Sequence, residues 1–385
     1  MNATIDLDHN ATTRLHPEVW DAMERTLADA GANPESQHAP GRRARRALEE
    51  CRERIAEILG CRIGPNGDRV LFTSGGTESN NMALRGLAIR DRRLVVSDIE
   101  HPSVAEVARA MALEGWKTGV LPVDADGIVD VDSAMAGSDG PTGLISVMLG
   151  NHETGVLQPV ARIAEIADRH GALVHTDAVQ AVGKGRVDFQ SLGVAAMTIS
   201  AHKFHGPVGI GALIVRRDAP IRPSHYGGSQ QGGLRPGTQP VWLAVGMRRA
   251  LELWHGERDE RAARMRRLRD RLEEALDREL PPIVVVGRNA PRLPHVSNIA
   301  FPGCDRQALM MALDARGVAC STGSACASGS SEPSPVLRAM RVPPEVLGGA
   351  LRFSLGAFTT EPEIDEAARR IAEAVRAIRA RGVSP

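Results

Sequence analysis

Lysines and long apolar runs are both scarce in this sequence. Only Lys117, Lys184 and Lys203 are lysines among the 47 basic residues of the 385-residue chain. Arginine stays protonated in proteins, whereas a buried lysine can lose its proton and act as an amine nucleophile. Chemistry that needs an amine therefore has three candidate side chains.

No stretch approaches the roughly 18 to 20 consecutive apolar residues that a membrane-spanning helix requires. The first residues, Met1 to Asp8, show no basic segment followed by an apolar one, so no secretory signal is predicted. The 47 basic residues are balanced by 47 acidic ones, which argues against a dedicated nucleic-acid-binding or membrane-surface protein. We expect a soluble, cytoplasmic protein that binds neither nucleic acid nor membrane.

Cysteine is also sparse, and its pattern excludes two classes of protein. The cysteines number five and include no Cys-x-x-Cys pair and no Cys/His cluster at zinc spacing, so no metal site is expected. A disulfide scaffold is not expected in a chain of this length without a secretion signal. At least one thiol is therefore a candidate for chemistry, among Cys51, Cys61, Cys304, Cys320 and Cys326.

The rest of the composition is typical of a globular protein, with 42% apolar and 24% charged residues. Short apolar runs alternate with helical patterns, such as 159–170, through the middle of the chain. This alternation predicts an α/β fold with a mostly parallel sheet, in which ligands bind at the carboxyl ends of the strands. The predicted strands are 69–73, 94–97, 142–148, 172–176, 196–200 and 211–215.

The pattern changes near residue 255. A long helix is predicted over 257–280, and its arginines alternate with acids, which is typical of a solvated face. A strand is predicted over 283–286, and a last helix begins at the capping box Thr360-Glu361-Pro362-Glu363. We predict a large α/β domain, 14–255, and a smaller α+β domain made of 1–13 and 256–385.

A glycine-containing turn joins the first predicted strand to a helix, in Thr73-Ser-Gly-Gly-Thr-Glu-Ser79. Glycines such as Gly76 let the backbone approach an anion closely, and a helix start supplies free N–H groups and a positive dipole end. Thr77 can add a hydroxyl group to such a phosphate site. The alternative is a tight turn with a capping threonine, and the stretch is neither a P-loop nor a G-x-G-x-x-G fingerprint.

An acid and a lysine follow two further predicted strands. Asp177 comes at the end of one strand, and Lys203, preceded by His202, follows the next. Pyridoxal phosphate requires a lysine that forms a Schiff base, a carboxylate at its pyridine nitrogen and a phosphate site. The turn at Thr77, Asp177 and Lys203 together favour this cofactor over the separate alternatives, a loop salt bridge for the acid and a surface position for the lysine.

Two more polar residues interrupt apolar surroundings. His101, in Ile99-Glu-His-Pro102, could stack on an aromatic cofactor and transfer protons, or it could cap a helix or fill the core. Arg352 interrupts an apolar strand, where a guanidinium could bind a substrate carboxylate bidentately. A salt bridge between domains is the alternative for Arg352.

Cys326 lies in a small, polar, Gly- and Ser-rich stretch that is typical of an exposed loop. A structural cysteine has apolar neighbours, and Cys326 does not, so it is the candidate for a working thiol. Cys320 follows Val318-Ala319, and we interpret it as packing at a strand end, with a role as a second thiol as the alternative.

Taken together, these motifs resemble the cysteine desulfurases of the NifS/IscS type, which are fold-type-I pyridoxal-phosphate enzymes, over nearly the whole chain. The Gly-Ser-Ala-Cys form of the last motif resembles the group with a mobile catalytic loop, here about 319–333. The resemblance implies a seven-stranded sheet and a homodimer. The matching stretches are 7–13, 33–38, 72–81, 100–101, 151–155, 175–180, 200–211, 235–238, 324–326 and 352–356.

For the cofactor, the resemblance implies that Lys203 carries pyridoxal 5'-phosphate and that Asp177 pairs with its ring nitrogen. His101 would stack on the ring and move protons, and Gln180 would bond the ring hydroxyl. The phosphate would be bound by Gly76, Thr77, Ser200 and His202, together with Thr238 of the partner subunit.

For the substrate, the resemblance implies L-cysteine, with its carboxylate held by Arg352 and Asn33. Cys326 would take the sulfur as a persulfide, release alanine and pass the sulfur to a protein acceptor. That acceptor could serve iron–sulfur cluster assembly, tRNA thiolation or DNA phosphorothioation. The alternatives are a selenocysteine lyase or related C–S lyase, and a sulfur-transfer scaffold without cofactor chemistry.

Two positions depart from the family pattern, and one of them is His9, which stands where asparagine is common. His152 stands where family members usually carry the second of two asparagines, which contacts the cofactor ring hydroxyl. A histidine there could still donate a hydrogen bond, and we expect it to change the titration of the cofactor.

Overall fold

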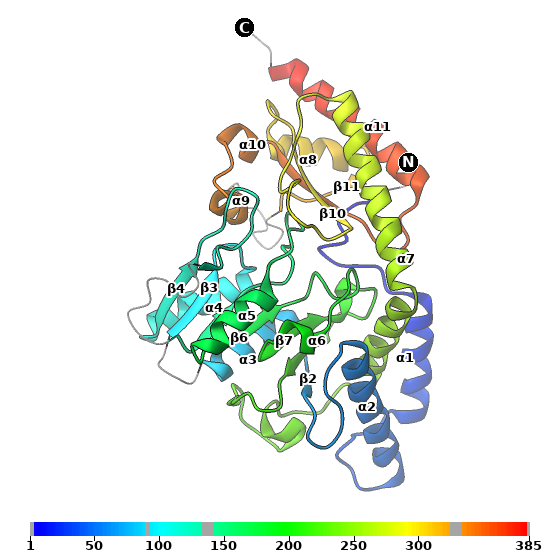
Figure 1. The fold of residues 1–385 in the computed structure, drawn as a ribbon. Coiled ribbons are helices and arrows are strands. Elements are labelled where there is room, and N and C mark those ends of the chain that lie inside the picture. Colours follow the sequence, from blue (N-terminus) through cyan, green and yellow to red (C-terminus); the bar gives the residue numbers. More distant parts are fainter. Residues whose placement is uncertain (1–3, 89–92, 133–141, 324–332, 383–385) are drawn as a thin grey trace.

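The computed structural model describes residues 4–88, 93–132, 142–323 and 333–382. Its centre is a seven-stranded sheet, which agrees with the predicted fold class (Figure 1). In spatial order the strands are β2 (Arg69–Thr73), β8 (Gly211–Val215), β7 (Ala196–Ser200), β6 (Leu173–Asp177), β5 (Leu144–Ser146), β3 (Arg93–Ser97) and β4 (Lys117–Leu121).

Strand direction decides which residues share an edge of the sheet. All neighbouring pairs are parallel except those of β8, which runs antiparallel to both β7 and β2. Two reversals leave β2 parallel to β7, so the carboxyl ends of β2, β7 and β6 lie at one edge. Thr73, Gly211 and Ser200 are paired side by side there.

Helices cover both faces of the sheet, which explains why the strands read as continuous apolar runs. Leu71, Leu94 and Leu144 pack toward α3 (Gly76–Leu87) and α4 (Pro102–Leu113). Their neighbours Val70, Val95 and Ile145 pack on the other side, because successive side chains of a strand alternate between faces. The helices of that side are α1 (Pro17–Ala30), α2 (Ala39–Ile58), α5 (Val160–Arg169), α6 (Phe189–Leu192) and the first half of α7 (Val241–Glu279).

A second, smaller core lies beside the first. Its antiparallel sheet has the order β12 (Ala350–Ser354), β10 (Val296–Ala300) and β9 (Val284–Val285), and β1 (Ile5–Asp6) pairs in parallel with β11 (Val318–Ala319). The end of α7 packs on this core. The helices α8 (Arg306–Asp314) and α11 (Glu361–Gly382) also pack on it, whereas α9 (Pro335–Ala339) and α10 (Pro344–Gly348) bury their apolar residues in the first core. α11 begins at the predicted capping box, where Thr360 N and Oγ1 both donate to Glu363 Oε2 at 2.8 Å.

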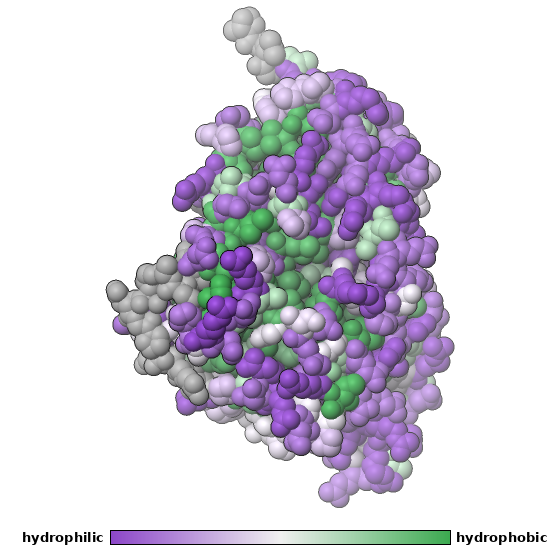
Figure 2. Space-filling model, viewed as in Figure 1, coloured by the Kyte–Doolittle hydropathy of each residue, from purple (hydrophilic) through white to green (hydrophobic). Residues whose placement is uncertain are grey.

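The long helix was predicted too short. It begins at Val241 rather than at residue 257, because Val245, Met247 and Leu251 form a buried face that continues into the predicted stripe. Hydrophilic side chains cover the outer side along α7 and α11 (Figure 2), as the alternating charges predict. The proposed domain boundary at 255 falls inside this helix and stays a prediction. Three strands, β1, β4 and β10, were not predicted at all.

None of the helices in the described parts of the chain has both the length and the apolar character needed to cross a bilayer.

Candidate active site

A cavity of about 270 Å³ lies at the carboxyl ends of β6 and β7, beside the first turns of α3 and α4. It brings together nine of the site residues that the sequence predicts, from five separate segments. These are Gly76, Thr77, His101, His152, Asp177, Gln180, Ser200, His202 and Lys203.

Lys203 lies in the short turn that follows β7, and its amine points to the N-terminal segment. Nζ donates to the main-chain oxygens of Asn10 at 2.5 Å and of Ala11 at 2.9 Å. Gln180 Nε2 donates to the same Asn10 oxygen at 3.1 Å. The N-terminal segment therefore forms one wall of the site and holds the amine beside the cavity.

Asp177 is the last residue of β6 and is 7% exposed. Its Oδ2 accepts from Asn80 Nδ2 at 2.7 Å and its Oδ1 from the Val179 N–H at 2.9 Å, so the carboxylate plane is fixed. Asn80 Nδ2 also donates to Ser103 Oγ at 2.8 Å. A series of hydrogen bonds thus connects α3, β6 and α4 behind the cavity.

His101 caps a helix, which is one of the roles considered for it, and it also lines the cavity. It is the N-cap of α4, with Nδ1 accepting from the Ser103 N–H at 3.1 Å. Because Nδ1 accepts that bond, the proton of the neutral ring is on Nε2. Burial lowers the pKa of His101, the charge of Asp177 raises it, and Lys203 and Arg352 lower it further, so the ring is neutral at physiological pH.

His152 lies edge-on to His101, with ring centroids 5.3 Å apart and planes at 80°. Burial, followed by His101, Arg352 and Lys203, lowers the pKa of His152 well below its usual value. Its Nδ1 is buried and has no hydrogen-bond partner in the described structure. A neutral imidazole therefore stands where the family pattern has an amide.

The start of α3 forms the end of the cavity next to Ser200. No side chain of the described residues caps this twelve-residue helix, whose N-cap is Gly75, so the capping-threonine alternative is not observed. A Cβ on Gly76 would lie 3.1 Å from Val179 Cγ2 and 3.8 Å from Ser200 Cβ, so this position favours glycine. The uncapped N–H groups and the helix dipole favour a phosphate here.

The polar atoms of the cavity fit pyridoxal phosphate. Besides His152 Nδ1, Gln180 Oε1 and Asn80 Oδ1 are buried without a partner among the described residues. Unpartnered buried polar atoms are costly, so a ligand with polar groups on an aromatic ring would satisfy them. Lys203, Asp177 and the α3 start supply the amine, the carboxylate and the anion site in the same cavity.

Arg352, on β12, does not line the cavity but adjoins it. It is 2% exposed, donates from Nη1 to the His152 main-chain oxygen at 3.0 Å and pairs through Nη2 with Asp8 Oδ1 at 2.7 Å. Both partners of this salt bridge belong to the predicted smaller domain, so it is not the salt bridge between domains that was the alternative for Arg352. Arg352 Nε is buried without a partner in the described chain.

Asn33 and Thr238 do not line this cavity. Both line a separate cavity of about 310 Å³ between α1 and the start of α7. Thr238 was expected to act in the site of a partner subunit. Its position outside the cavity of its own subunit is compatible with that expectation but does not test it. The role of Asn33 stays a prediction.

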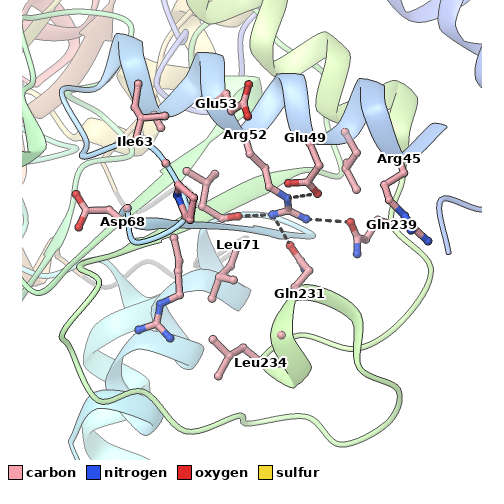
Figure 3. A pocket seen from close by; sticks show the side chains of 18 of the residues that line it. Arg45, Glu49, Arg52, Glu53, Ile63, Asp68, Leu71, Gln231, Leu234 and Gln239 are labelled. Carbon is pink, nitrogen blue, oxygen red and sulfur yellow. Dashed lines mark hydrogen bonds and ion pairs between the residues drawn. The ribbon is translucent and has the colours of Figure 1, made fainter. Parts of the chain in front are cut away.

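Another cavity, of about 540 Å³, lies between α2 and β2 and contains none of the predicted site residues (Figure 3). Arg52 crosses its wall and donates to the Val70 main chain, to Gln231 Oε1 at 3.1 Å and to Gln239 Oε1 at 2.9 Å. Gln231 in turn bonds the N–H and oxygen of Phe72. These bonds fix the segment that carries Thr238 to the edge of the sheet.

The described cysteines are not suited to nucleophilic chemistry. Burial raises the pKa of Cys51 to about 12 and that of Cys320 to about 12, and it also raises the pKa of Cys61 and Cys304. Cys320 packs against the smaller core, as its position after β11 predicts. Cys326 lies outside the described residues, and its assignment stays a prediction.

Sequence reasoning missed three residues of the site: Asn10, Asn80 and Ser103. Asn80 lies three residues after Thr77 in a predicted helix, a spacing that places both on one side, and this signal was available. Nothing in the sequence indicates that Asn10 meets Lys203, because 193 residues separate them.

Comparison with known proteins agrees with this geometry. The aminotransferase class-V family model matches residues 5–367. A cysteine desulfurase IscS of Dictyoglomus turgidum is 40% identical over 98% of this chain and 97% of its own, and a cysteine desulfurase of Cereibacter sphaeroides is 43% identical over 93% and 92%. A solved NifS-like protein superposes with a TM-score of 0.89 at 34% identity, covering 97% of this chain and 100% of its own. The chain therefore belongs to the cysteine desulfurases of the aminotransferase class-V family.

Proposed function

We propose that the protein is a pyridoxal-phosphate-dependent L-cysteine desulfurase. It converts L-cysteine to L-alanine, with the sulfur captured as a persulfide on Cys326 and then passed to a protein acceptor. The observation that carries the proposal is that Lys203 and Asp177 line one cavity with the uncapped start of α3. The identity to cysteine desulfurases over nearly the full length supports the same reaction.

When bound, the cofactor supplies an electron sink that stabilises negative charge on the substrate next to the C–S bond. Asp177, oriented by Asn80, would hold a proton on the ring nitrogen. Lys203 would bind the cofactor, and its amine would move a proton at the substrate carbon. His101 carries its proton on Nε2 and is neutral, so it can donate a proton and take it back.

The transfer of sulfur requires a thiolate as the nucleophile. The thiolate of Cys326 attacks the substrate sulfur, an S–S bond forms, the C–S bond breaks, and the carbon takes up a proton to become the methyl group of alanine. The raised pKa of each described cysteine, caused by burial, supports Cys326 as the nucleophile. Arg352, beside His152, is the charged group that would receive the substrate carboxylate, together with Asn33.

The active unit that we propose is a homodimer in which Thr238 completes the phosphate site of the other subunit. The position of Thr238 supports this proposal, because Thr238 lines a separate cavity and does not line the cavity of its own subunit that holds Thr77.

Alanine release from L-cysteine by the purified protein tests the proposal, with Cys326→Ala, Lys203→Ala and the control Cys320→Ala. We expect both Cys326→Ala and Lys203→Ala to lose at least about 1,000-fold in rate, as removal of a nucleophile typically causes. Only Lys203→Ala should lose the visible absorption of the bound cofactor, and Cys320→Ala should stay active. A wild-type rate in Cys326→Ala would contradict the persulfide step and favour a selenocysteine lyase or related C–S lyase.

A further inference from the structure

Lys184 is a fully buried lysine that the proposed reaction does not use. It lies in the turn after β6, is 2% exposed, and its Nζ is 3.1 Å from His295 Nε2. Among the described residues, no carboxylate oxygen lies within 4.0 Å of this amine. A buried ammonium without a counterion is strongly disfavoured, so the surroundings of Lys184 favour the uncharged amine.

The hydrogen bonds of His295 lead to the same conclusion. Its Nε2 lies 2.8 Å from Asn10 Oδ1 as well as 3.1 Å from the amine. Asn10 Nδ2 donates to the His152 main-chain oxygen at 3.0 Å, which leaves Oδ1 as the atom that faces the imidazole. An oxygen there requires the proton of His295 to be on Nε2. If Lys184 were an ammonium, its N–H groups would face the N–H of His295 Nε2, and no hydrogen bond could form. The uncharged amine instead has a lone pair that accepts from His295 Nε2.

Asn10 connects this pair to the active site. Its main-chain oxygen accepts from Lys203 Nζ at 2.5 Å and from Gln180 Nε2 at 3.1 Å. Its N–H donates to Ser354 Oγ at 2.9 Å. Asn10 is therefore held at its side chain by His295 and presents its carbonyl group to the lysine of the site.

The charged and titratable groups that influence Lys184 are all bases. Burial, followed by the positive charges of Lys203 and Arg352, lowers the pKa of Lys184 to about 7. The groups that interact with it come from the N-terminal segment, the turn after β7, the segment before β10 and β12. They are His9, His202, Lys203, His205, His295 and Arg352.

We propose that Lys184 is a positioning residue for Lys203: as an uncharged amine it orients His295, and through it Asn10, so that the Asn10 carbonyl group receives the Lys203 amine. This inference rests on the proposed function, in which Lys203 carries the cofactor. The hydrogen bonds that join Lys184, His295 and Asn10 set the position of the Lys203 amine before it binds the cofactor.

The scarcity of lysine makes the charge of Lys184 directly measurable. The full-length protein, grown with lysine labelled with ¹³C at Cε, has three such carbons, which Lys117→Arg and Lys184→Met assign. We expect the Lys184 signal to titrate near pH 7, well below the ordinary lysine value of about 10.4. A Lys184 signal that is still protonated at pH 9 would overturn the proposal.

The positioning role is tested by the release of the cofactor, followed by its visible absorption, in Lys184→Met and in the matched surface variant Lys117→Met. We expect the cofactor to leave Lys184→Met at least about 10-fold faster than wild type, a usual effect of removing a residue that supports a binding residue from behind. The release rate of Lys117→Met should not change. His295→Gln keeps an N–H donor for Asn10 and should release the cofactor more slowly than His295→Leu.

Equal release rates in wild type and Lys184→Met would show that Asn10 is placed without this amine and would overturn the positioning role. None of these measurements depends on the formation of alanine from the substrate. They can therefore fail while the desulfurase proposal stands, and they can succeed if the substrate proves to be another amino acid.

Discussion

At the scale of single residues, the site depends on partners that hold its charged groups from behind. Asn80 is the clearest case, because one amide nitrogen donates both to Asp177 Oδ2 at 2.7 Å and to Ser103 Oγ at 2.8 Å. Ser103 also bonds His101 Nδ1 at 2.8 Å. The carboxylate and the imidazole of the site are thus oriented through one buried amide.

Asn80→Asp should weaken cofactor binding at least about 10-fold. The substitution replaces a hydrogen-bond donor with a second acid beside Asp177. A neighbouring carboxylate raises the pKa of an acid by a unit or more, and one pKa unit corresponds to a 10-fold change in an equilibrium constant. The dissociation constant of pyridoxal phosphate, from absorption titration of the stripped protein, checks this. Asn81→Asp is the control, since Asn81 lies next in the helix and bonds only the Thr77 main chain among the described residues. Equal constants for the two variants would contradict the role of Asn80.

The residues whose place in one cavity could be predicted from the sequence are those whose position follows from topology. Asp177 and Lys203 both follow strands that are buried on both faces, and parallel neighbours bring such ends together. Asn10 and His295 could not be predicted, because their meeting depends on how the smaller core packs against the larger one. His101 shows a third case, in which the helix-capping alternative is confirmed and the role toward the cofactor stays a prediction.

At the scale of elements, the phosphate end of the cavity depends on one reversed strand. β8 lies between β2 and β7, so its first residue, Gly211, fills the space between the start of the α3 turn and Ser200. A Cβ on Gly211 would lie 2.7 Å from the carbonyl carbon of Gly75 and 2.8 Å from the Ile199 oxygen. Only a glycine lets the turn approach the end of β7 this closely.

Gly211→Ala should therefore displace the turn and weaken cofactor binding by about 10- to 100-fold, the cost that a misplacement of about 1 Å can cause. Gly256→Ala is the matched control, because Gly256 lies in α7 and a Cβ added there would meet no atom of another residue within 4 Å. The control should bind normally and gain about 0.5 to 1 kcal/mol in stability from the helix preference of alanine. Circular dichroism separates weak binding from unfolding, and unchanged binding in Gly211→Ala would refute the close-approach argument.

The strands of the large sheet other than β4 were predictable to within one or two residues at most ends, since each is a continuous apolar run. β1 and β4 could not be predicted on that basis: β1 has two residues, and β4 is mostly exposed. The start of α7 was missed because Gly256 interrupts a pattern that the buried face of Val245 and Leu251 nevertheless continues.

At the scale of the whole molecule, the protein buries several histidines in their neutral form. His175 is fully buried between β5 and β7, with Nδ1 2.9 Å from Ser146 Oγ and Nε2 3.0 Å from Thr198 Oγ1. Burial lowers the pKa of His175 to about 3 and that of His205 to about 3. Each of these rings must remain uncharged for the fold to persist.

The free energy of unfolding should therefore fall as the pH drops below 6.5. The unfolded chain takes up a proton on each such histidine near its ordinary pKa of 6.5, whereas the folded chain does not until about pH 3. Stability is full above pH 6.5, and His175 alone should cost about 1.4 kcal/mol per pH unit below it. Urea midpoints at pH 7.5 and pH 5.5 measure the slope. His175→Gln should flatten it, and the exposed His225→Gln should not; a wild-type midpoint that does not change with pH would contradict the argument.

The distribution of the three lysines has a consequence for selectivity toward aldehydes. Pyridoxal phosphate is itself an aldehyde, and it condenses with any accessible primary amine. In this protein Lys184 is buried, Lys203 lines the cofactor cavity, and Lys117 on β4 is exposed, while arginines provide the rest of the basic side chains. Guanidinium groups attract the phosphate of the free cofactor without forming a Schiff base with it. An arginine-rich surface thus offers the cofactor few amines other than Lys203 with which to condense.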